Sequence, residues 1–230
     1  MRVDNDARCA TRCELHLGVG KRYDSFICMF FGNGVGSGIV IDRKIYAGHH
    51  FCAGEIGHHK LDQGGGPCNC GARGCFETFV NATAIIRRAE ALVRRQSKKT
   101  MLARFAGSIT TYNIADAAAS GDAVAKEVLN EIGMIIGAGI SNYVNILDPG
   151  AVVLGGGVMD GLFPYLARGI YKGIEDNVLP EIKPTAIVSS EHINDAPAIG
   201  AALLFRPADT WTAVTLPSEP ILSARLRAQP

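Results

Sequence analysis

The sequence predicts a single α/β lobe, and three observations support this fold class. The 230 residues, 47% of them hydrophobic, are enough to bury one large core or two small ones. Apolar segments of strand length alternate with longer segments of helical periodicity, in the order strand, strand, insert, helices, strand, helix, strand, helix. No internal repeat divides the chain into copies of a smaller unit.

Charge and hydropathy exclude several classes of protein. The formal net charge is +1 and the basic residues are scattered, so there is no electrostatic footprint for nucleic acid. The first residues are charged where a signal peptide needs an apolar segment, and polar residues interrupt the longest apolar stretch, 132–147. We therefore expect a soluble cytoplasmic protein with no membrane partner. The odd number of cysteines, seven, then favours reduced thiols over a disulfide framework.

The first elements follow from short local patterns. Residues 4–17 begin with an Asp-Asn-Asp run that favours a helix start and continue with helix-forming residues. Two strands are expected at 25–31 and 38–45, joined by the glycine series 32–38 as a hairpin. The next segment, 48–74, is rich in glycine, histidine and cysteine, which suits an inserted loop held by something other than a hydrophobic core.

The rest of the chain alternates helices and strands. Helical periodicity is expected at 82–95, 114–119, 123–147, 162–174 and 196–204, and strands at 151–154 and 186–189. The segment 123–147 is long and apolar enough to be a central packed helix. Together these elements predict one lobe over 1–205, with a loop insertion at about 48–80. Residues 206–230 lack clear periodicity and are expected to form a tail or an arm on a neighbour.

Three cysteines and a histidine in the loop have the composition of a metal site. Cys68, Cys70 and Cys75 have the spacing C-x-C-x4-C, and His58 lies ten positions upstream of the first. Zinc prefers four tetrahedral nitrogen and sulfur ligands, and three cysteines with one histidine form a closed, structural set. The interior glycines let the backbone wrap tightly around an ion.

Other interpretations of this cluster remain open from the residues alone. Two of the thiols could form a disulfide, although a reducing compartment disfavours it. The residues could also cluster by chance in a loop, and the adjacent His59 could replace His58 as a ligand. A catalytic zinc is disfavoured because four protein ligands leave no open position. We predict structural zinc.

Several motifs in order along the chain resemble the ROK family of bacterial sugar kinases and sugar-responsive repressors. They are VDNDA near the start, FGNGVGSG, GEIGHH, CNCGARGCFE and NILDPGAVVLGGGV. The E-x-G-H motif followed by C-x-C-G-x-x-G-C-x-E is highly specific. The resemblance runs from about residue 3 to residue 205 and implies an actin-like, hexokinase-like (ribonuclease H-like) lobe with a zinc-stabilised loop insertion.

The resemblance implies a sugar site. Asn5 corresponds to the family's sugar-binding Asn, and Asp6 to the catalytic Asp, which also contacts the sugar and accepts the proton of the attacking hydroxyl. Glu55 and Glu77 would accept hydrogen bonds from sugar hydroxyls, and His58 would bind zinc through one nitrogen and face the sugar with its other edge. Without the motifs, the Asn5-Asp6 pair would be a helix cap, and the two glutamates solvated loop carboxylates.

The resemblance also implies a nucleotide site. Gly32, Gly34 and Gly36 belong to a turn that closes over ATP phosphates through backbone N–H groups, although Asn33 stands where kinases commonly carry threonine. A strand rather than a helix follows these glycines, so they are not a dinucleotide fingerprint. Gly155, Gly156 and Gly157 resemble the family's adenosine-side glycines, with a plain strand-to-helix turn as the alternative.

The resemblance further implies an upstream strand and an Asp-x-Gly-Gly-Thr turn for phosphate and magnesium, whereas this chain starts almost at Asn5. The chain is therefore expected to be a shortened product, a piece of a longer protein or a protein completed by another chain. Three functions remain, and the first is the one we predict, because Asn5, Asp6, Glu55, His58 and Glu77 form a complete set on the sugar side. The first is a kinase that uses ATP and Mg2+ on an aldohexose or N-acetylhexosamine. The others are a sugar-sensing regulator, which binds nucleic acid only if a helix-turn-helix lies upstream, and an inactive remnant. The family resemblance also suggests a homodimer.

Overall fold

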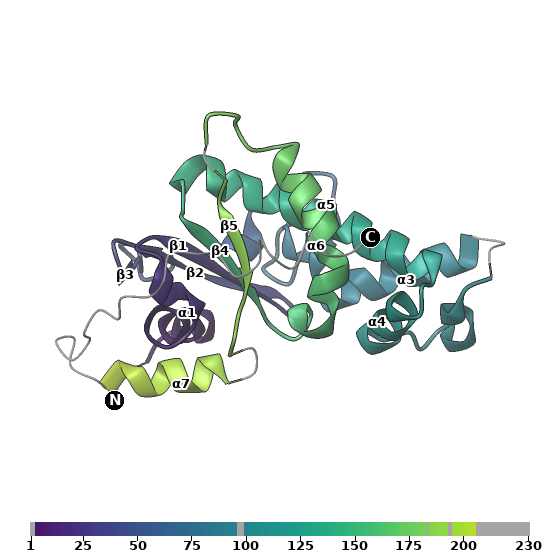
Figure 1. The fold of residues 1–230 in the computed structure, drawn as a ribbon, viewed down its shortest axis with the longest axis horizontal. Helices are drawn as coiled ribbons and strands as arrows, with labels where there is room; N and C mark the ends of the chain where they lie inside the picture. The colour runs from purple at the N-terminus through teal and green to yellow at the C-terminus, as the bar shows by residue number, and fades with distance from the viewer. Residues whose placement is uncertain (1–2, 96–98, 183, 193–194, 206–230) are drawn as a thin grey trace.

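The computed structural model describes residues 3–95, 99–182, 184–192 and 195–205, so the expected tail or arm at 206–230 lies outside the described residues. A five-stranded mixed sheet in the order β3-β2-β1-β4-β5 forms the centre (Figure 1). Strand β1 (Phe26–Phe31) pairs antiparallel with β2 (Val35–Ile41) and parallel with β4 (Ala151–Gly155). The edge strands are β3 (Lys44–Ile45), antiparallel to β2, and β5 (Ala186–Ser189), parallel to β4.

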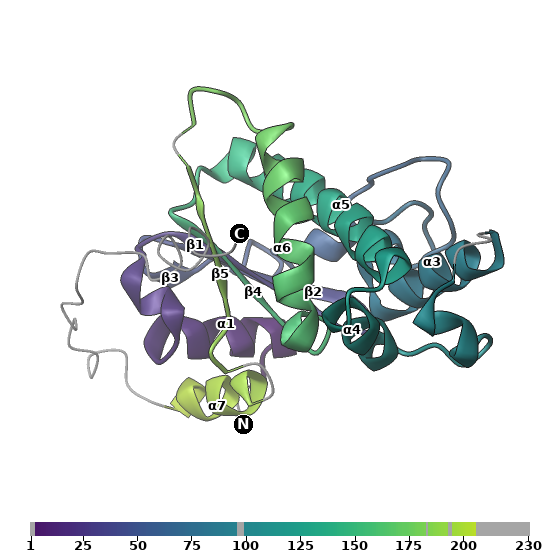
Figure 2. The ribbon, with the colours of Figure 1, turned by 45° about the vertical axis from the view of Figure 1, so that its right-hand side comes forward.

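Helices cover both faces of this sheet (Figures 1 and 2). Helix α1 (Asp6–His16) lies against one face and packs on α7 (Ala196–Ala202), whereas α5 (Ala123–Leu147) and α6 (Met159–Glu175) lie against the other. Alternate residues of β1 serve the two layers: Phe26 and Cys28 join the α1-side core, and Ile27, Met29 and Phe31 join the larger one. The central strands β1 and β4 are therefore buried on both faces of the sheet.

The remaining helices extend the α5 side. They are α2 (Glu77–Val80), α3 (Ala82–Arg95) and α4 (Thr111–Ala119). The 3-10 turns are η1 (Val19–Arg22) beside α1, η2 (Ile56–His58), η3 (Met101–Phe105), and η4 (Leu203–Phe205) after α7. The predicted helices 82–95 and 123–147 and the strand 186–189 have the observed bounds. The predicted helix at 162–174 is also found: α6 is assigned from Met159, but Asp160 and Gly161 are non-helical. None of the helices in the described part of the chain is both long and apolar enough to cross a membrane.

The predicted boundaries of the second strand were wrong. Strand β2 begins at Val35, inside the glycine series, and the chain turns at Asp42 and Arg43, whose φ values of 49° and 59° are those of a tight hairpin turn. The glycines at 36 and 38 are strand residues beneath α1. A Cβ on Gly36 would lie 2.9 Å from Ala7 Cβ, so the close approach of the helix, rather than a loop, requires glycine here.

Candidate functional site

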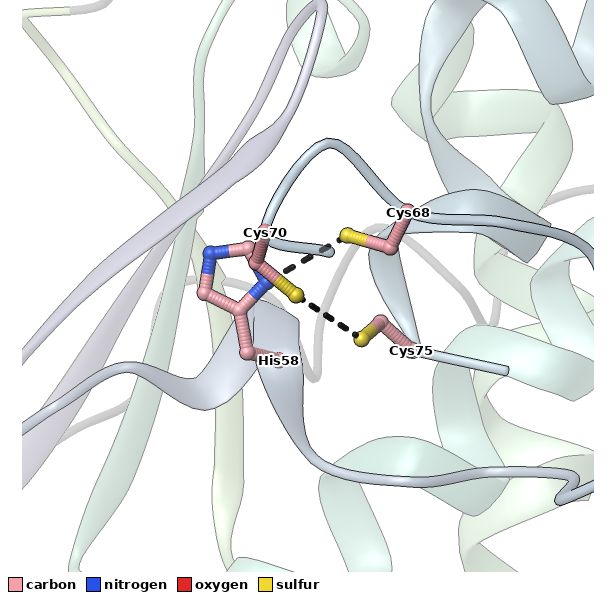
Figure 3. Close-up of side chains that lie close together, drawn as sticks. All are labelled: His58, Cys68, Cys70 and Cys75. Atoms are coloured by element: carbon pink, nitrogen blue, oxygen red, sulfur yellow. Dashed lines mark hydrogen bonds between the residues drawn. The ribbon is translucent and has the colours of Figure 1, made fainter. Parts of the chain in front are cut away.

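The predicted metal ligands converge from three parts of the loop (Figure 3). His58 is the last residue of η2, Cys68 and Cys70 lie in the following turn, and Cys75 precedes α2. One ligand atom from each residue lies within 4.8 Å of all the others. The Cys68 sulfur is 3.6 Å from His58 Nδ1, and the Cys70 and Cys75 sulfurs are also 3.6 Å apart.

These separations fit tetrahedral coordination rather than a disulfide. With Zn–S bonds of about 2.3 Å, two ligands of a tetrahedral site lie about 3.8 Å apart. A disulfide would need its sulfurs about 2.0 Å apart, and the three loop cysteines are free thiols. The donor set of three sulfurs and one imidazole nitrogen therefore suits a closed four-coordinate metal site.

The backbone of the loop is folded to bring these side chains together. Isolated bridges join Lys60 to Cys75 and Pro67 to Arg73. Gly74 has a φ of +67°, and a Cβ there would collide with the Asp62 carbonyl group. Only glycine fits this position, which lies immediately before the ligand Cys75.

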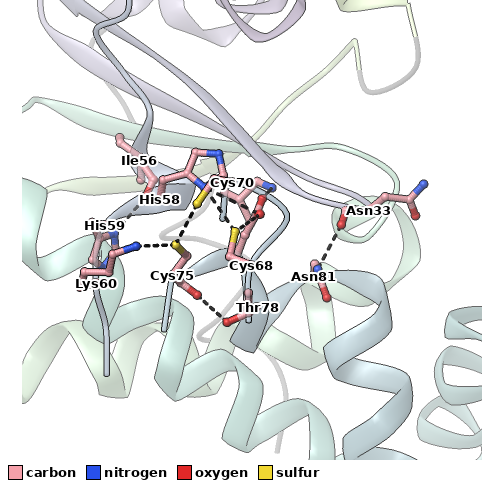
Figure 4. A network of polar contacts seen from close by, with 12 residues as sticks. Asn33, Ile56, His58, His59, Lys60, Cys68, Cys70, Cys75, Thr78 and Asn81 are labelled. Carbon is pink, nitrogen blue, oxygen red and sulfur yellow. Dashed lines mark hydrogen bonds and ion pairs between the residues drawn. The ribbon is translucent and has the colours of Figure 1, made fainter. Parts of the chain in front are cut away.

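Polar contacts tie the cluster to its surroundings (Figure 4). Lys60 Nζ donates to the Cys75 sulfur at 2.7 Å, and the Cys68 thiol donates to Glu77 Oε1 at 3.0 Å. His59 points away from the cluster: its ring stacks on Phe76, and its Nδ1 is 2.8 Å from the Ile56 carbonyl oxygen. Burial lowers the pKa of His59. The geometry therefore favours His58 over His59 as the fourth ligand.

The Asn-Asp pair lies at the N-terminus of α1. Asn5 is the N-cap, because its side-chain oxygen accepts a hydrogen bond from the Arg8 backbone N–H at 3.1 Å. Asp6 is the exposed first residue of the helix, and its Oδ1 accepts from the Ala7 N–H at 2.8 Å. The helix-cap interpretation of Asn5 is therefore confirmed as a local contact, and it leaves the Asn5 side-chain NH2 group as a donor.

A cavity of about 390 Å³ brings Asp6 and both glycine turns together. Its lining includes Asp6, Glu77 and the glycines Gly32, Gly34, Gly36, Gly156 and Gly157. The predicted residues Asn5, Glu55, His58 and Gly155 are not in its lining. Gly155 ends β4, where a Cβ would lie 2.9 Å from the Phe30 ring, so packing requires glycine at this position.

Glu77 connects the cluster of His58, Cys68, Cys70 and Cys75 to this cavity. Its side chain is 13% exposed, its Oε1 lies 3.7 Å from His58 Nδ1, and its Oε2 accepts from the Val35 N–H at 3.3 Å. Glu77 is thus held between the cluster and the first glycine turn rather than solvated. Glu55, in contrast, is exposed.

Sequence reasoning missed Ser37, which fixes the backbone on both sides of Glu55. Its buried hydroxyl donates to the Gly54 carbonyl oxygen and accepts from the Ile56 N–H at 3.2 Å. No local pattern marks this contact, because Ser37 lies within β2 and its two partners are 17 and 19 residues away along the chain.

Comparison with known proteins places the chain in a family. The sequence profile of the ROK family matches residues 1–208. The chain belongs to the ROK family. It is similar to a glucokinase of Halalkalibacterium halodurans, with 35% identity over 208 residues, 89% of this chain and 63% of that protein. It is also similar to a Yersinia pestis N-acetylmannosamine kinase, with 32% identity over 88% of this chain and 63% of that protein. The chain thus spans less than two thirds of the length of these relatives.

Solved ROK structures share its fold. A ROK glucokinase from Streptomyces griseus, in complex with glucose and AMPPNP, matches with a TM-score of 0.81 and 31% identity over 88% of this chain and 67% of that one. A ROK transcriptional regulator, a homologue of the E. coli MLC protein, matches with a TM-score of 0.78 and 31% identity over 88% of this chain and 50% of that one. The predicted α/β, hexokinase-like lobe is confirmed.

Proposed function

We propose that this ROK chain contributes to a sugar kinase that transfers the γ-phosphate of ATP to a hydroxyl of an aldohexose or N-acetylhexosamine. The main support is the cavity that joins Asp6 to the glycine turns, because phosphoryl transfer needs an acceptor hydroxyl and a phosphate chain in one place. The similar proteins that are named glucokinase and N-acetylmannosamine kinase support the two sugar classes.

Each group would have a distinct task in this reaction. Asp6, exposed at the helix N-terminus, would accept the proton of the attacking hydroxyl. The turn of Gly32, Gly34 and Gly36 would border the phosphates, although the Gly32 N–H already donates to the Gly34 carbonyl oxygen at 2.9 Å and is not a free phosphate donor. Gly156 and Gly157 would border the adenosine side. Mg2+ bound with ATP would neutralise phosphate charge. The proposed role of Gly155 stays a prediction.

On the sugar side, four residues would bind hydroxyls. The Asn5 side-chain NH2 group would donate to the sugar, and Glu55 and Glu77 would accept from it. His58 would present its Nε2 edge to the sugar. Its Nδ1 faces the cysteines and lies 3.6 Å from the Cys68 sulfur. The exposed position of Glu55 suits a group that is desolvated only by the ligand.

Zinc is the metal that we propose for the cluster of His58, Cys68, Cys70 and Cys75. Three thiolates with one imidazole match its preference for sulfur and nitrogen, and a closed set of four ligands indicates a structural role. When bound, zinc would fix the loop that carries His58 and Glu77, which has little hydrophobic core of its own. The predicted homodimer is not tested by a single chain and stays a prediction.

Substitution of Asp6 tests the kinase proposal. In the protein expressed from its complete reading frame, Asp6→Ala is expected to lower kcat for ATP-dependent phosphorylation by about 10²–10⁴-fold, the usual range for a general base. Titration calorimetry is expected to show nearly unchanged sugar affinity. Asp116→Ala, an exposed aspartate of α4, is the matched control. Full turnover by Asp6→Ala would rule out its role as the base.

A sugar-sensing regulator is the second candidate, and Asn33 favours it. Asn33 is exposed in the first glycine turn, where its carbonyl oxygen accepts from Asn81 Nδ2 at 3.1 Å (Figure 4). A kinase would be expected to carry threonine at this position. If the complete protein binds sugar without consuming ATP and releases DNA when sugar is added, the regulator is correct and the kinase is wrong.

A further inference from the structure

Arg8 is a charged side chain buried in the first turn of α1. It is 8% exposed and lies two residues after Asp6. Its guanidinium group contacts two separate segments. Nη1 donates to the Phe51 carbonyl oxygen at 2.7 Å, and Nε lies 2.7 Å from Asp4 Oδ1. The Asp4 oxygen lies off the N–H direction of Nε, so this contact is an ion pair rather than an aligned hydrogen bond.

The contact between Arg8 and Phe51 holds a loop that is not anchored by a buried Phe51 side chain. Phe51 has a φ of +58°, a left-handed value that is costly for an aromatic residue, and the residue is 73% exposed. Backbone hydrogen bonds close the loop locally, from Ala53 N–H to the Ala47 carbonyl oxygen at 3.0 Å. Arg8 supplies a link from this loop to α1.

Glu55 is the last residue of this loop, which comprises residues 47–55. Ser37 anchors the backbone on both sides of Glu55 to β2, and Arg8 anchors the loop four residues earlier to α1. The two anchors belong to different elements, so together they set the position of Glu55 relative to the helix that carries Asp6.

We propose that Arg8 is a positioning residue for the sugar site, holding the loop 47–55 against the N-terminus of α1 so that Glu55 and Asp6 face one ligand. This inference rests on the sugar kinase proposed above. A planar guanidinium group suits the task because Nη1 donates to the Phe51 carbonyl oxygen while Nε forms an ion pair with Asp4. A lysine ammonium group could keep one of these contacts only.

Arg12 provides a matched control. It lies one turn after Arg8 on α1, and its Nη2 contacts Asp4 Oδ2 at 3.2 Å. Arg8 and Arg12 therefore contact the same carboxylate. Of these two arginines, only Arg8 also donates to the Phe51 carbonyl oxygen. Substitution of Arg12 removes one positive charge beside Asp4 and leaves the hydrogen bond between Arg8 and Phe51 in place.

The rate of proteolysis after Phe51 measures how firmly Arg8 holds the loop, and it needs no ligand. Chymotrypsin cleaves after aromatic residues, and cleavage at Phe51 requires the carbonyl group that Arg8 holds. We expect Arg8→Met to increase the rate of cleavage between Phe51 and Cys52 by about tenfold, as measured by mass spectrometry of the fragments, since one charge-assisted hydrogen bond is lost. Arg12→Met is expected to match the unmodified protein. Equal rates for Arg8→Met and the unmodified protein would overturn the anchor.

The affinity of Arg8 variants for sugar tests whether Arg8 positions Glu55. With glucose and N-acetylmannosamine as probes, Arg8→Met is expected to weaken binding about tenfold at an unchanged melting temperature, and Arg8→Lys to recover part of the loss. If Arg8 acts through Glu55, the effect of Arg8→Met should nearly vanish in a Glu55→Gln background. An equal loss in both backgrounds would overturn the positioning role. If the unmodified protein binds neither sugar, the sugar site itself is wrong, and the cleavage rates alone decide whether Arg8 anchors the loop.

Discussion

At the residue scale, the convergence of His58, Cys68, Cys70 and Cys75 could be predicted because these residues form a local sequence pattern. The residues that hold the neighbouring backbone could not. Ser37 and Arg8 act on carbonyl groups of Gly54 and Phe51, which are distant in sequence and carry no recognisable motif. The helix-cap contact of Asn5 was foreseen as an alternative to sugar binding, and the structure shows that capping occupies only its side-chain oxygen.

Glu14 is a second buried charge of α1 that sequence reasoning did not single out. Its Oε1 accepts from the Ser190 hydroxyl at 2.6 Å and its Oε2 from the Val19 N–H at 3.0 Å. Burial raises the pKa of Glu14 above its ordinary value of 4.5, although these two hydrogen bonds lower it in part. The nearby His192 charge acts in the lowering direction and Glu191 in the raising direction.

The raised pKa of Glu14 predicts a pH dependence of stability. Between pH 4.5 and the higher pKa of the folded state, the folded protein binds more protons than the unfolded chain, so the free energy of unfolding should fall as pH rises through that window. Glu14→Gln should remove this component, because the serine hydroxyl can turn to accept from the new amide. Urea unfolding of both proteins between pH 4.5 and 8 is the measurement. Identical pH profiles would contradict the assignment.

At the element scale, periodicity predicted the long helices well because each buries one continuous stripe. It failed at β2, where glycine looked like a loop signal although the cause was the closeness of α1 to the sheet. The same cause acts between α5 and α6, whose glycines at 133, 137, 169 and 173 bring the two backbones into contact. Glycines four residues apart mark a closely packed face on each helix, but the sequence of one helix does not say which partner packs there.

Gly137→Ala tests this close packing. A Cβ at Gly137 would lie 2.9 Å from Gly173 Cα and would clash with the Ile170 carbonyl oxygen. Alanine ordinarily stabilises a helix relative to glycine by about 1 kcal/mol, but overpacking here is expected to lower the free energy of unfolding by about 1–3 kcal/mol. The measurement is urea unfolding, with exposed Lys126→Ala of the same helix as control. A stabilised Gly137→Ala protein would show that α5 and α6 are not in close contact.

At the scale of the whole molecule, the fold brings distant motifs to one side of the sheet. Asp6 begins α1, the first glycine turn joins β1 to β2, and Gly156 and Gly157 follow β4, so the ends of neighbouring elements meet at one cavity. Glu77 lines this cavity, accepts from the Val35 N–H beside the first glycine turn, and contacts the proposed zinc ligands through Cys68. Order along the sequence predicted the lobe, but the cavity depends on strand pairing, which the sequence pattern leaves unspecified.

The metal content of the purified protein tests the zinc-held loop most directly. Elemental analysis of material prepared without chelators is expected to give one zinc per chain, bound by His58, Cys68, Cys70 and Cys75. Cys75→Ser is expected to lose the metal, whereas Cys52→Ser, an exposed thiol outside the cluster, should keep it. A folded protein that contains no stoichiometric transition metal would contradict a zinc-held loop.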